Sequence, residues 1–409
     1  LKQFGTISLK GFGIEQLHHA IASCGALLHY LGETKHDKLQ HITHISRIEE
    51  DQYVWLDRFT VRNLELFGSS HDNGKCLIDV IDSSVTPMGS RLLKRWLALP
   101  LKHAETINER LEVVSYFIEH ATKQSELRAL LKEIGDLERL ISKVAAGKIN
   151  PRELVQLKRS LTLIESTKAL IQDCNNKSLQ KINDQLNPCV IMRNRLETEL
   201  NEEAPVLLAK GNVINKGVNA ELDELRAIAF SGKDYLLQIQ QREIERTGIS
   251  SLKISYNNVF GYYLEVTNVH KDKVPSDWIR KQTLTTAERY ITPELKVYEE
   301  KILGAEDKIA LLEQTLYSNL VSDLIEYIVP IQLNANLIAR LDCLVSFSTL
   351  AVENQYVKPT IKDDFVINII DGRHPVIEKQ LPIDMAYVSN SVYLDNETQQ
   401  VMMITGPNM

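Results

Sequence analysis

Apolar residues recur at three- and four-residue steps through most of the chain, and this spacing predicts a mainly helical protein. Residues 86–99 show the pattern clearly: Thr86 can cap the helix, Pro87 occupies the first helical position, and Pro100 ends the run. Similar helical spacing runs through residues 105–147 and 152–175.

Two further runs exceed the length of an ordinary helix. The first is residues 218–247, and the second begins at Thr292-Pro293 and ends before Pro330. Their mixed three- and four-residue apolar steps are the spacing that two helices packed along each other require. Thirty helical residues span about 45 Å. Separate core helices of one large domain are the alternative interpretation, and the sequence between the two runs favours a pair.

That intervening sequence, residues 249–292, is here named the tip segment. Apolar and polar residues alternate on both sides of Asn257-Asn258, which predicts a β-hairpin. A small sheet between two long helices is most simply placed at the tip of an antiparallel helical hairpin. The fold class expected is therefore mainly α, with a helical core and a β-rich tip.

The last fifty residues change pattern again. Residues 365–370 and 401–405 read as strands, and the second is so apolar that we expect it to be buried on both faces. It runs into Gly406, as a strand does at the start of a phosphate-binding loop, although a plain strand-to-turn junction is the alternative. No Lys-Ser/Thr pair follows Gly406, so the chain as given is not expected to hydrolyse ATP.

The overall charge of −7 excludes a general electrostatic attraction to nucleic acid. The tip segment, however, carries six basic and four acidic residues, and so is positive on an acidic chain. Five scattered cysteines without a Cys-x-x-Cys pair indicate neither a disulfide framework nor a zinc site, which is typical of the cytoplasm. No secretion leader or uncharged membrane span is recognisable, so no membrane partner is expected.

The basic and hydroxyl side chains of the tip segment are candidates for contact with the DNA backbone. Lysine and arginine neutralise phosphates, and threonine hydroxyls donate hydrogen bonds to phosphate oxygens. A solvated surface over a small aromatic core, or a tip that binds protein, are the alternatives. Replacing Arg280 and Lys281 together is expected to weaken DNA binding and its salt dependence. The candidates are Lys253, Lys271, Lys273, Arg280, Lys281, Thr283, Thr285, Thr286 and Arg289.

Several stretches, in this order and spacing, resemble the MutS family of DNA mismatch repair proteins, of the bacterial type. The resemblance covers essentially the whole chain. It is carried by FTVRNLEL at 59–66, VTPMGSRLLKRWL at 85–97, ELDELR at 221–226, ERTG at 245–248, NVFGYY at 258–263, QTLTTAERY at 282–290, PEL at 293–295, GRHPV at 372–376 and TGPNM at 405–409.

The resemblance implies an organisation in which long antiparallel lever helices carry a β-rich clamp, followed by the first strands of a C-terminal α/β P-loop domain. The chain would then be an internal fragment that lacks the N-terminal mismatch-binding domain and most of the ATPase domain. The boundaries implied are 1–40 for the end of the connector domain, 41–234 for the first core and lever helices, 235–294 for the clamp, 295–355 for the returning lever, and 356–409 for the start of the ATPase domain.

The resemblance also implies a function. The parent protein would be a cytoplasmic, nucleoid-associated homodimer that binds mismatched double-stranded DNA, uses ATP and Mg²⁺ to become a sliding clamp, and works with a MutL-type partner. No bound cofactor is expected on this chain. A family member acting in recombination is the alternative. The nucleotide-binding residues implied are Tyr387 and Val388 for the adenine and Gly406, Pro407, Asn408 and Met409 for the phosphates.

Overall fold

The computed structural model describes residues 1–34, 39, 42, 45–69, 71, 74–257, 261–382 and 385–405. Helices predominate within these residues, accompanied by a four-stranded antiparallel sheet and a two-stranded sheet. The predicted fold class, mainly helical with a small β-rich part, is confirmed. The chain forms two compact units: unit 1 is 1–149, 156–193 and 324–409, and unit 2 is 150–155 and 194–323.

Unit 1 is built around one buried helix, α13 (Ile328–Asn354), which packs against α4, α5, α6, α7 and α9. The stretch Pro293–Asn354 includes a window that is long and apolar enough to cross a membrane, but 67% of that window is buried inside the structure, as in a core helix. The described α-helices of unit 1 that precede residue 150 are α1 (His18–Glu33), α2 (Arg58–Asn63), α3 (Leu77–Ile81), α4 (Pro87–Ala98), α5 (Ala104–Glu119), α6 (Ala121–Glu133) and α7 (Leu137–Ala145). α9 (Lys177–Gln185) also belongs to unit 1, whereas α8 (Pro151–Ile171) and α10 (Val190–Glu199) each have residues in both units.

The start of α4 is fixed by a fully buried carboxylate from α13. Thr86 caps α4 as predicted, because its Oγ1 accepts a hydrogen bond from the Gly89 N–H at 2.9 Å. Asp342 accepts hydrogen bonds from the Val85 N–H at 3.0 Å, the Thr86 N–H at 2.7 Å and the Thr86 hydroxyl at 2.6 Å. A Cβ on Gly89 would lie 2.2 Å from Asp342 Oδ2. This close approach explains why the motif at 85–97 has glycine at position 89.

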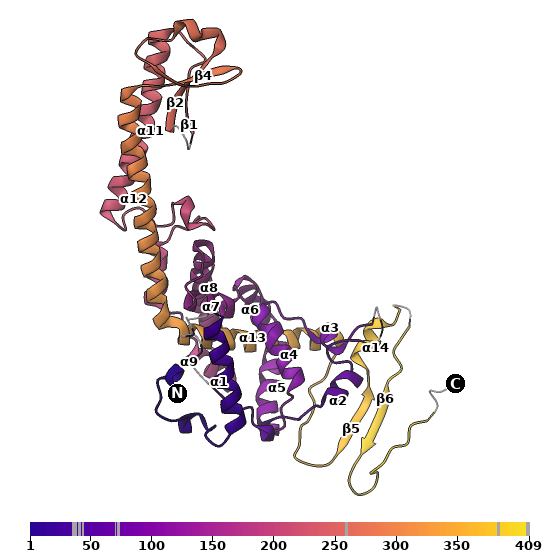
Figure 1. Cartoon of the computed structure of the whole chain (residues 1–409). Helices are drawn as coiled ribbons and strands as arrows, with labels where there is room; N and C mark the ends of the chain where they lie inside the picture. Colours follow the sequence, from indigo (N-terminus) through magenta and orange to yellow (C-terminus); the bar gives the residue numbers. More distant parts are fainter. Residues whose placement is uncertain are drawn as a thin grey trace. The chain divides into compact units, whose positions relative to one another are not determined.

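Unit 2 contains the two long helices, α11 (Ala220–Thr247) and α12 (Pro293–Asp323), which lie side by side and antiparallel (Figure 1). Asn219 caps α11 by accepting from the Leu222 N–H at 2.9 Å, and Gly248 ends it at φ +65°. The two long runs are thus helices, as predicted. The predicted end before Pro330 is wrong: α12 ends at Asp323, and Pro330 lies in the first turn of α13, where its missing N–H costs no helical hydrogen bond.

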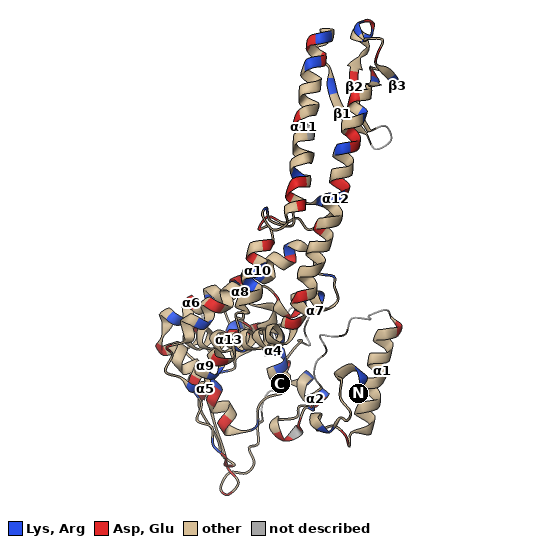
Figure 2. Cartoon of the chain, turned by 90° about the vertical axis from the view of Figure 1, so that its left-hand side faces the viewer, with Lys and Arg blue, Asp and Glu red and all other residues tan. Residues whose placement is uncertain are grey.

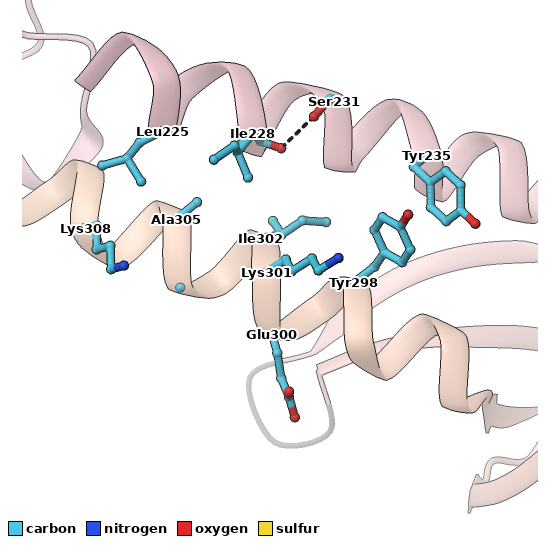
Figure 3. Close-up of a pocket in the computed structure, with 11 residues that line it drawn as sticks. Leu225, Ile228, Ser231, Tyr235, Tyr298, Glu300, Lys301, Ile302, Ala305 and Lys308 are labelled. Carbon is cyan, nitrogen blue, oxygen red and sulfur yellow. Dashed lines mark hydrogen bonds between the residues drawn. The ribbon is translucent and has the colours of Figure 1, made fainter. Parts of the chain in front are cut away.

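A hollow of about 660 Å³ lies between α11 and α12 (Figure 3). Small residues at Ser231, Gly304 and Ala305 leave this space unfilled. Tyr235 and Tyr298 also line the hollow, and their rings stack across the two helices with centroids 3.9 Å apart. The helical pair is therefore close-packed at the tyrosines and loosely packed next to them.

The tip segment folds as predicted into a small sheet, with β1 (Lys253–Asn257), β2 (Gly261–Thr267), β3 (Ile279–Thr283) and β4 (Ala287–Ile291) in the order β1-β2-β4-β3. The predicted hairpin pairs Asn257 with Gly261, and its turn at Asn258 lies outside the described residues. Apolar residues of the sheet pack against α11 and α12, with Leu264 and Val266 of β2 among the most buried. A 3₁₀ helix, η5 (Asn268–Lys273), follows β2.

The C-terminal part of unit 1 pairs β5 (Ile367–Gly372) with β6 (Asn390–Leu394) in antiparallel fashion, with α14 (Pro375–Gln380) between them. The strand predicted at 365–370 is confirmed in its main part. The strand predicted at 401–405 is wrong: these residues form no strand, and Val401 is 80% exposed. A strand buried on both faces needs neighbours on both sides, and no described element pairs with this segment.

Candidate nucleic-acid interface

A row of polar side chains crosses the sheet, because the strand register sets Lys253 opposite Glu265, Glu265 opposite Arg289, and Arg289 opposite Gln282. Arg289 donates to Glu265 Oε2 at 3.2 Å and to Gln282 Oε1 at 2.8 Å, and its guanidinium lies 4.3 Å from the centroid of the Tyr263 ring. Its side chain is only 18% exposed. Arg289 therefore joins three strands, and a DNA phosphate would have to displace these contacts.

Two more of the acidic residues in the tip segment are neutralised by arginines. Arg280 Nη1 donates to Glu288 Oε1 at 3.4 Å, and Glu288 also accepts from the Tyr290 hydroxyl. Burial raises the pKa of Tyr290 to about 12. Arg246 of α11 donates to both carboxylate oxygens of Asp277, at 3.0 and 2.8 Å, and holds the pKa of Asp277 below its usual value. Arg280 remains 62% exposed, so its pair leaves the guanidinium partly open to solvent.

Four lysines of the tip segment are exposed and have no ion pair within the described part of the chain: Lys253, Lys271, Lys273 and Lys281. Lys271 and Lys273 lie on η5. Lys281 is the extra residue of a β-bulge in the edge strand β3, where the register shifts between Arg280 and Gln282. A bulge with a lysine also protects a sheet edge from unwanted pairing, which is a structural reason for the same residue. The excess positive charge of the tip segment therefore resides on lysines.

The exposed threonines meet η5 at one end of the sheet. Asn268, the first residue of η5, donates from its backbone N–H to Thr286 O at 3.1 Å and from its side chain to Thr285 O at 3.0 Å. The β3–β4 turn, with Thr283, Thr285 and Thr286, is thereby tied to the helix that carries Lys271 and Lys273. We call this the threonine end of the sheet. Figure 2 shows basic residues, with acidic ones interspersed, along the sheet end of unit 2.

The sequence did not predict the hydrogen bond that joins the β1–β2 hairpin to α12. Glu299 of α12 accepts a hydrogen bond from the Tyr262 N–H at 3.1 Å. Gly261 has φ +75°, and a Cβ there would lie 2.0 Å from Glu299 Oε1. The signal available in the sequence was a glycine next to an expected hairpin turn, but its partner lies 38 residues away and is set only by the packing of the sheet on α12.

We expect Arg289→Ala to lower the stability of the sheet without changing the salt dependence of DNA binding. The substitution leaves Glu265 without its ion pair and uncovers Tyr263, at a cost of about 1 kcal/mol. Hydrogen exchange of the β2 and β4 amides measures the first effect, and binding titrations at several salt concentrations measure the second. A lower salt slope with unchanged exchange would show that Arg289 contacts phosphate and is not the sheet's internal tie.

Of the implied nucleotide-binding residues, Tyr387 and Val388 are among the residues that the structure describes. Tyr387 is half-buried and Val388 is exposed, both in the non-helical segment ahead of β6. The side-chain amide of Asn390 donates to Val388 O at 3.3 Å. The four residues at 406–409, Gly406 to Met409, lie outside the described residues.

These features define the protein as one in which a pair of long antiparallel helices presents a small, lysine-bearing sheet, and a helical unit is built around one buried helix. The family model described as MutS domain III matches residues 59–348. The chain belongs to the MutS family, and the resemblance read from its motifs is confirmed.

Close relatives carry the name of a repair protein. The chain is 60% identical to the DNA mismatch repair protein MutS of Bacteroides fragilis, over all of this chain and 47% of the relative. It is 59% identical to that of Flavobacterium psychrophilum, over 99% of this chain and 47% of the relative. The chain thus spans about half the length of the curated relatives that it matches.

Proposed function

We propose that this chain supplies the lever helices and the DNA clamp of a DNA mismatch repair protein, and that the sheet holds the DNA backbone without sequence preference. The observation that carries the proposal is the set of four exposed lysines without ion pairs among the described residues, two of which, Lys271 and Lys273, lie on the 3₁₀ helix that is tied to the threonine end. The names of the relatives support the role in repair.

The proposed contact is electrostatic and does not read bases. Each lysine ammonium that neutralises a phosphate releases condensed counterions, and the threonine hydroxyls donate hydrogen bonds to phosphate oxygens. Lys253, Lys271, Lys273 and Lys281 are the main contributors in this proposal, with Thr283, Thr285 and Thr286 beside them and Arg280 at the partly exposed edge. Arg289 contributes indirectly, because its contacts with Glu265 and Gln282 stabilise the sheet.

For the whole protein we propose the remaining functions that the family implies. These are mismatch recognition, ATP and Mg²⁺ binding, ATP hydrolysis, homodimer formation, sliding on DNA, a MutL-type partner and a cytoplasmic location. Tyr387, Val388 and residues 406–409 would hold the nucleotide. The proposed domain limits remain 1–40, 41–234, 235–294, 295–355 and 356–409.

Binding of the 409-residue chain to matched and singly mismatched duplexes, at about 0.05 M and about 0.2 M salt, tests the clamp. Four phosphate contacts predict a slope near −3.6 in log affinity against log salt, hence a loss on the order of 100-fold between the two conditions. We expect equal affinity for the two duplexes, because a backbone contact carries no information about base pairing. A clear preference for the mismatch, or binding that salt does not weaken, would contradict the proposal.

A further inference from the structure

Unit 1 contains a second pocket that has no part in the proposed DNA contact. It has a volume of about 340 Å³ and lies among α4, α5 and α13. Its lining is almost entirely apolar, and the exception is the guanidinium of Arg110 from α5. Pockets of this size admit one large side chain or a small ligand. The lining includes Trp96 of α4, Leu111 and Val114 of α5 and Phe347 of α13, together with Arg110.

Arg110 is a partly buried cation that has no carboxylate partner among the described residues. Its guanidinium carbon lies 3.6 Å from the centroid of the Trp96 ring. Neither Arg110 nor the neighbouring Arg340 has a hydrogen bond or an ion pair in the described chain. Burial lowers the pKa of Arg110 to about 10, and the positive charge of Arg340 acts in the same direction. A desolvated cation normally has a partner, so the pocket favours an anion.

The stacking geometry leaves Arg110 able to receive that anion. A guanidinium that lies over an indole ring uses its face for the stack, while its N–H groups point outward in its own plane. A carboxylate can therefore form the two-pronged pair with Arg110 without displacing Trp96. Leu111, Val114 and Phe347 would surround an apolar group attached to that carboxylate.

The apolar surface continues beyond the pocket. The segment at 52–54 runs along the rim, because the Val54 N–H donates to Pro100 O at 2.8 Å and the Lys102 N–H donates to Gln52 O at 3.1 Å. Val54 is 44% exposed, and Trp55, which follows it, is 66% exposed. An occupant that covers this rim as well as the pocket is longer than a small metabolite. The surface fits a peptide segment.

We propose that this pocket, the Arg110 pocket, docks a segment of a partner protein that carries a large apolar side chain next to an Asp or Glu. The apolar side chain fills the space against Trp96 and Phe347, and the carboxylate pairs with Arg110. Aromatic and arginine anchors of this kind provide most of the affinity at protein interfaces. The partner is thus defined by an acidic-apolar sequence, and the docking is independent of DNA.

Two peptides that differ only in a carboxylate against a carboxamide test the proposal on the unmodified 409-residue chain. The probes are acetyl-Ser-Leu-Phe-Asp-Ser-amide and its Asn counterpart, titrated by NMR saturation transfer at millimolar concentration. We expect the Asp peptide to bind at least fivefold more tightly than the Asn peptide. Equal binding of the two, or no binding of either, would overturn the proposal.

A variant pair and a small acid complete the test. Arg110→Gln should remove the preference for the Asp peptide, whereas Arg95→Gln, an exposed arginine of α4 outside the pocket, should retain it. The comparison on the unmodified chain stands even if Arg110→Gln fails to fold. The small acid is 3-phenylpropionate. If it bound while both peptides were excluded, the pocket would be a metabolite site, and the docking proposal would be wrong.

Discussion

Replacing Lys271, Lys273 and Lys281 together by glutamine should weaken binding to a matched duplex on the order of 500-fold at about 0.1 M salt. Each phosphate contact contributes about −0.9 to the slope of log affinity against log salt, so the triple variant loses about 2.7 from that slope. At about 1 M salt, counterion release contributes nothing to the affinity, so the unmodified chain and the variant should bind equally there. Over the one decade from about 1 M to about 0.1 M salt, a slope difference of about 2.7 becomes a difference in affinity on the order of 500-fold. Glutamine retains the length and polarity of the side chains, and the fold should persist.

The matched control removes three exposed lysines of unit 1, Lys94, Lys132 and Lys362, and changes the net charge by the same amount. Its affinity for DNA and its salt slope should stay close to those of the unmodified chain. Equal losses in both triple variants would mean that net charge, and not the tip segment, governs binding. Fluorescence anisotropy with labelled duplexes over a series of salt concentrations measures both quantities.

The second large effect is expected in unit 1, at Asp342. Asp342→Ala should lower the free energy of opening α4 by roughly 3 kcal/mol, because the buried N–H of Thr86 and the partly buried N–H of Val85 lose their acceptor. The Thr86 hydroxyl loses its acceptor too, which loosens the cap of α4. Hydrogen exchange of the α4 amides, followed by mass spectrometry, reports this opening locally.

Two further variants separate the hydrogen bonds of Asp342 from its packing. Asp342→Asn keeps one acceptor oxygen and should lose about half as much free energy. Gly89→Ala keeps the carboxylate but forces it away from a new methyl group, at a cost of about 1–3 kcal/mol. If Asp342→Ala left the α4 exchange unchanged, water would have to be reaching the cap, and the carboxylate would not be what fixes the helix start.

Local signals in the sequence were enough for α4, for α11 and most of α12, and for the hairpin, whereas the predicted run at 105–147 is divided into α5, α6 and α7. Thr86 and Pro87 predicted the start of α4, and apolar spacing predicted α11 and most of α12. Period-two alternation around residue 257 predicted the β1–β2 pair. In each case the signal and the structure it predicts lie within a few residues, so the chain's own spacing carries the information. The motif resemblance added the identity of the family, which spacing alone does not specify.

Ion pairs and contacts between residues distant in the chain could not be predicted from the sequence. Lys281 and Arg289 are both basic, yet the strand register sets Arg289 between Glu265 and Gln282, while Lys281 lies at a bulge in the edge strand and has no ion pair with any described residue. In the same way, the apolar run at 401–405 looked like a buried strand, although burial depends on neighbours that the run itself cannot encode.

The sequence by itself determined the helical class, the long paired helices, the β-rich tip and its net positive charge. Tertiary structure alone decided which cations of that tip remain available and which carboxylate binds the cap of α4. It also decided that Arg110 lies over Trp96 with no ion-pair partner in the part of the chain that the structure describes. The physical reason is the same in all three cases. Spacing along a chain fixes local backbone conformation, whereas the state of a charge depends on which distant groups the fold brings within hydrogen-bonding distance.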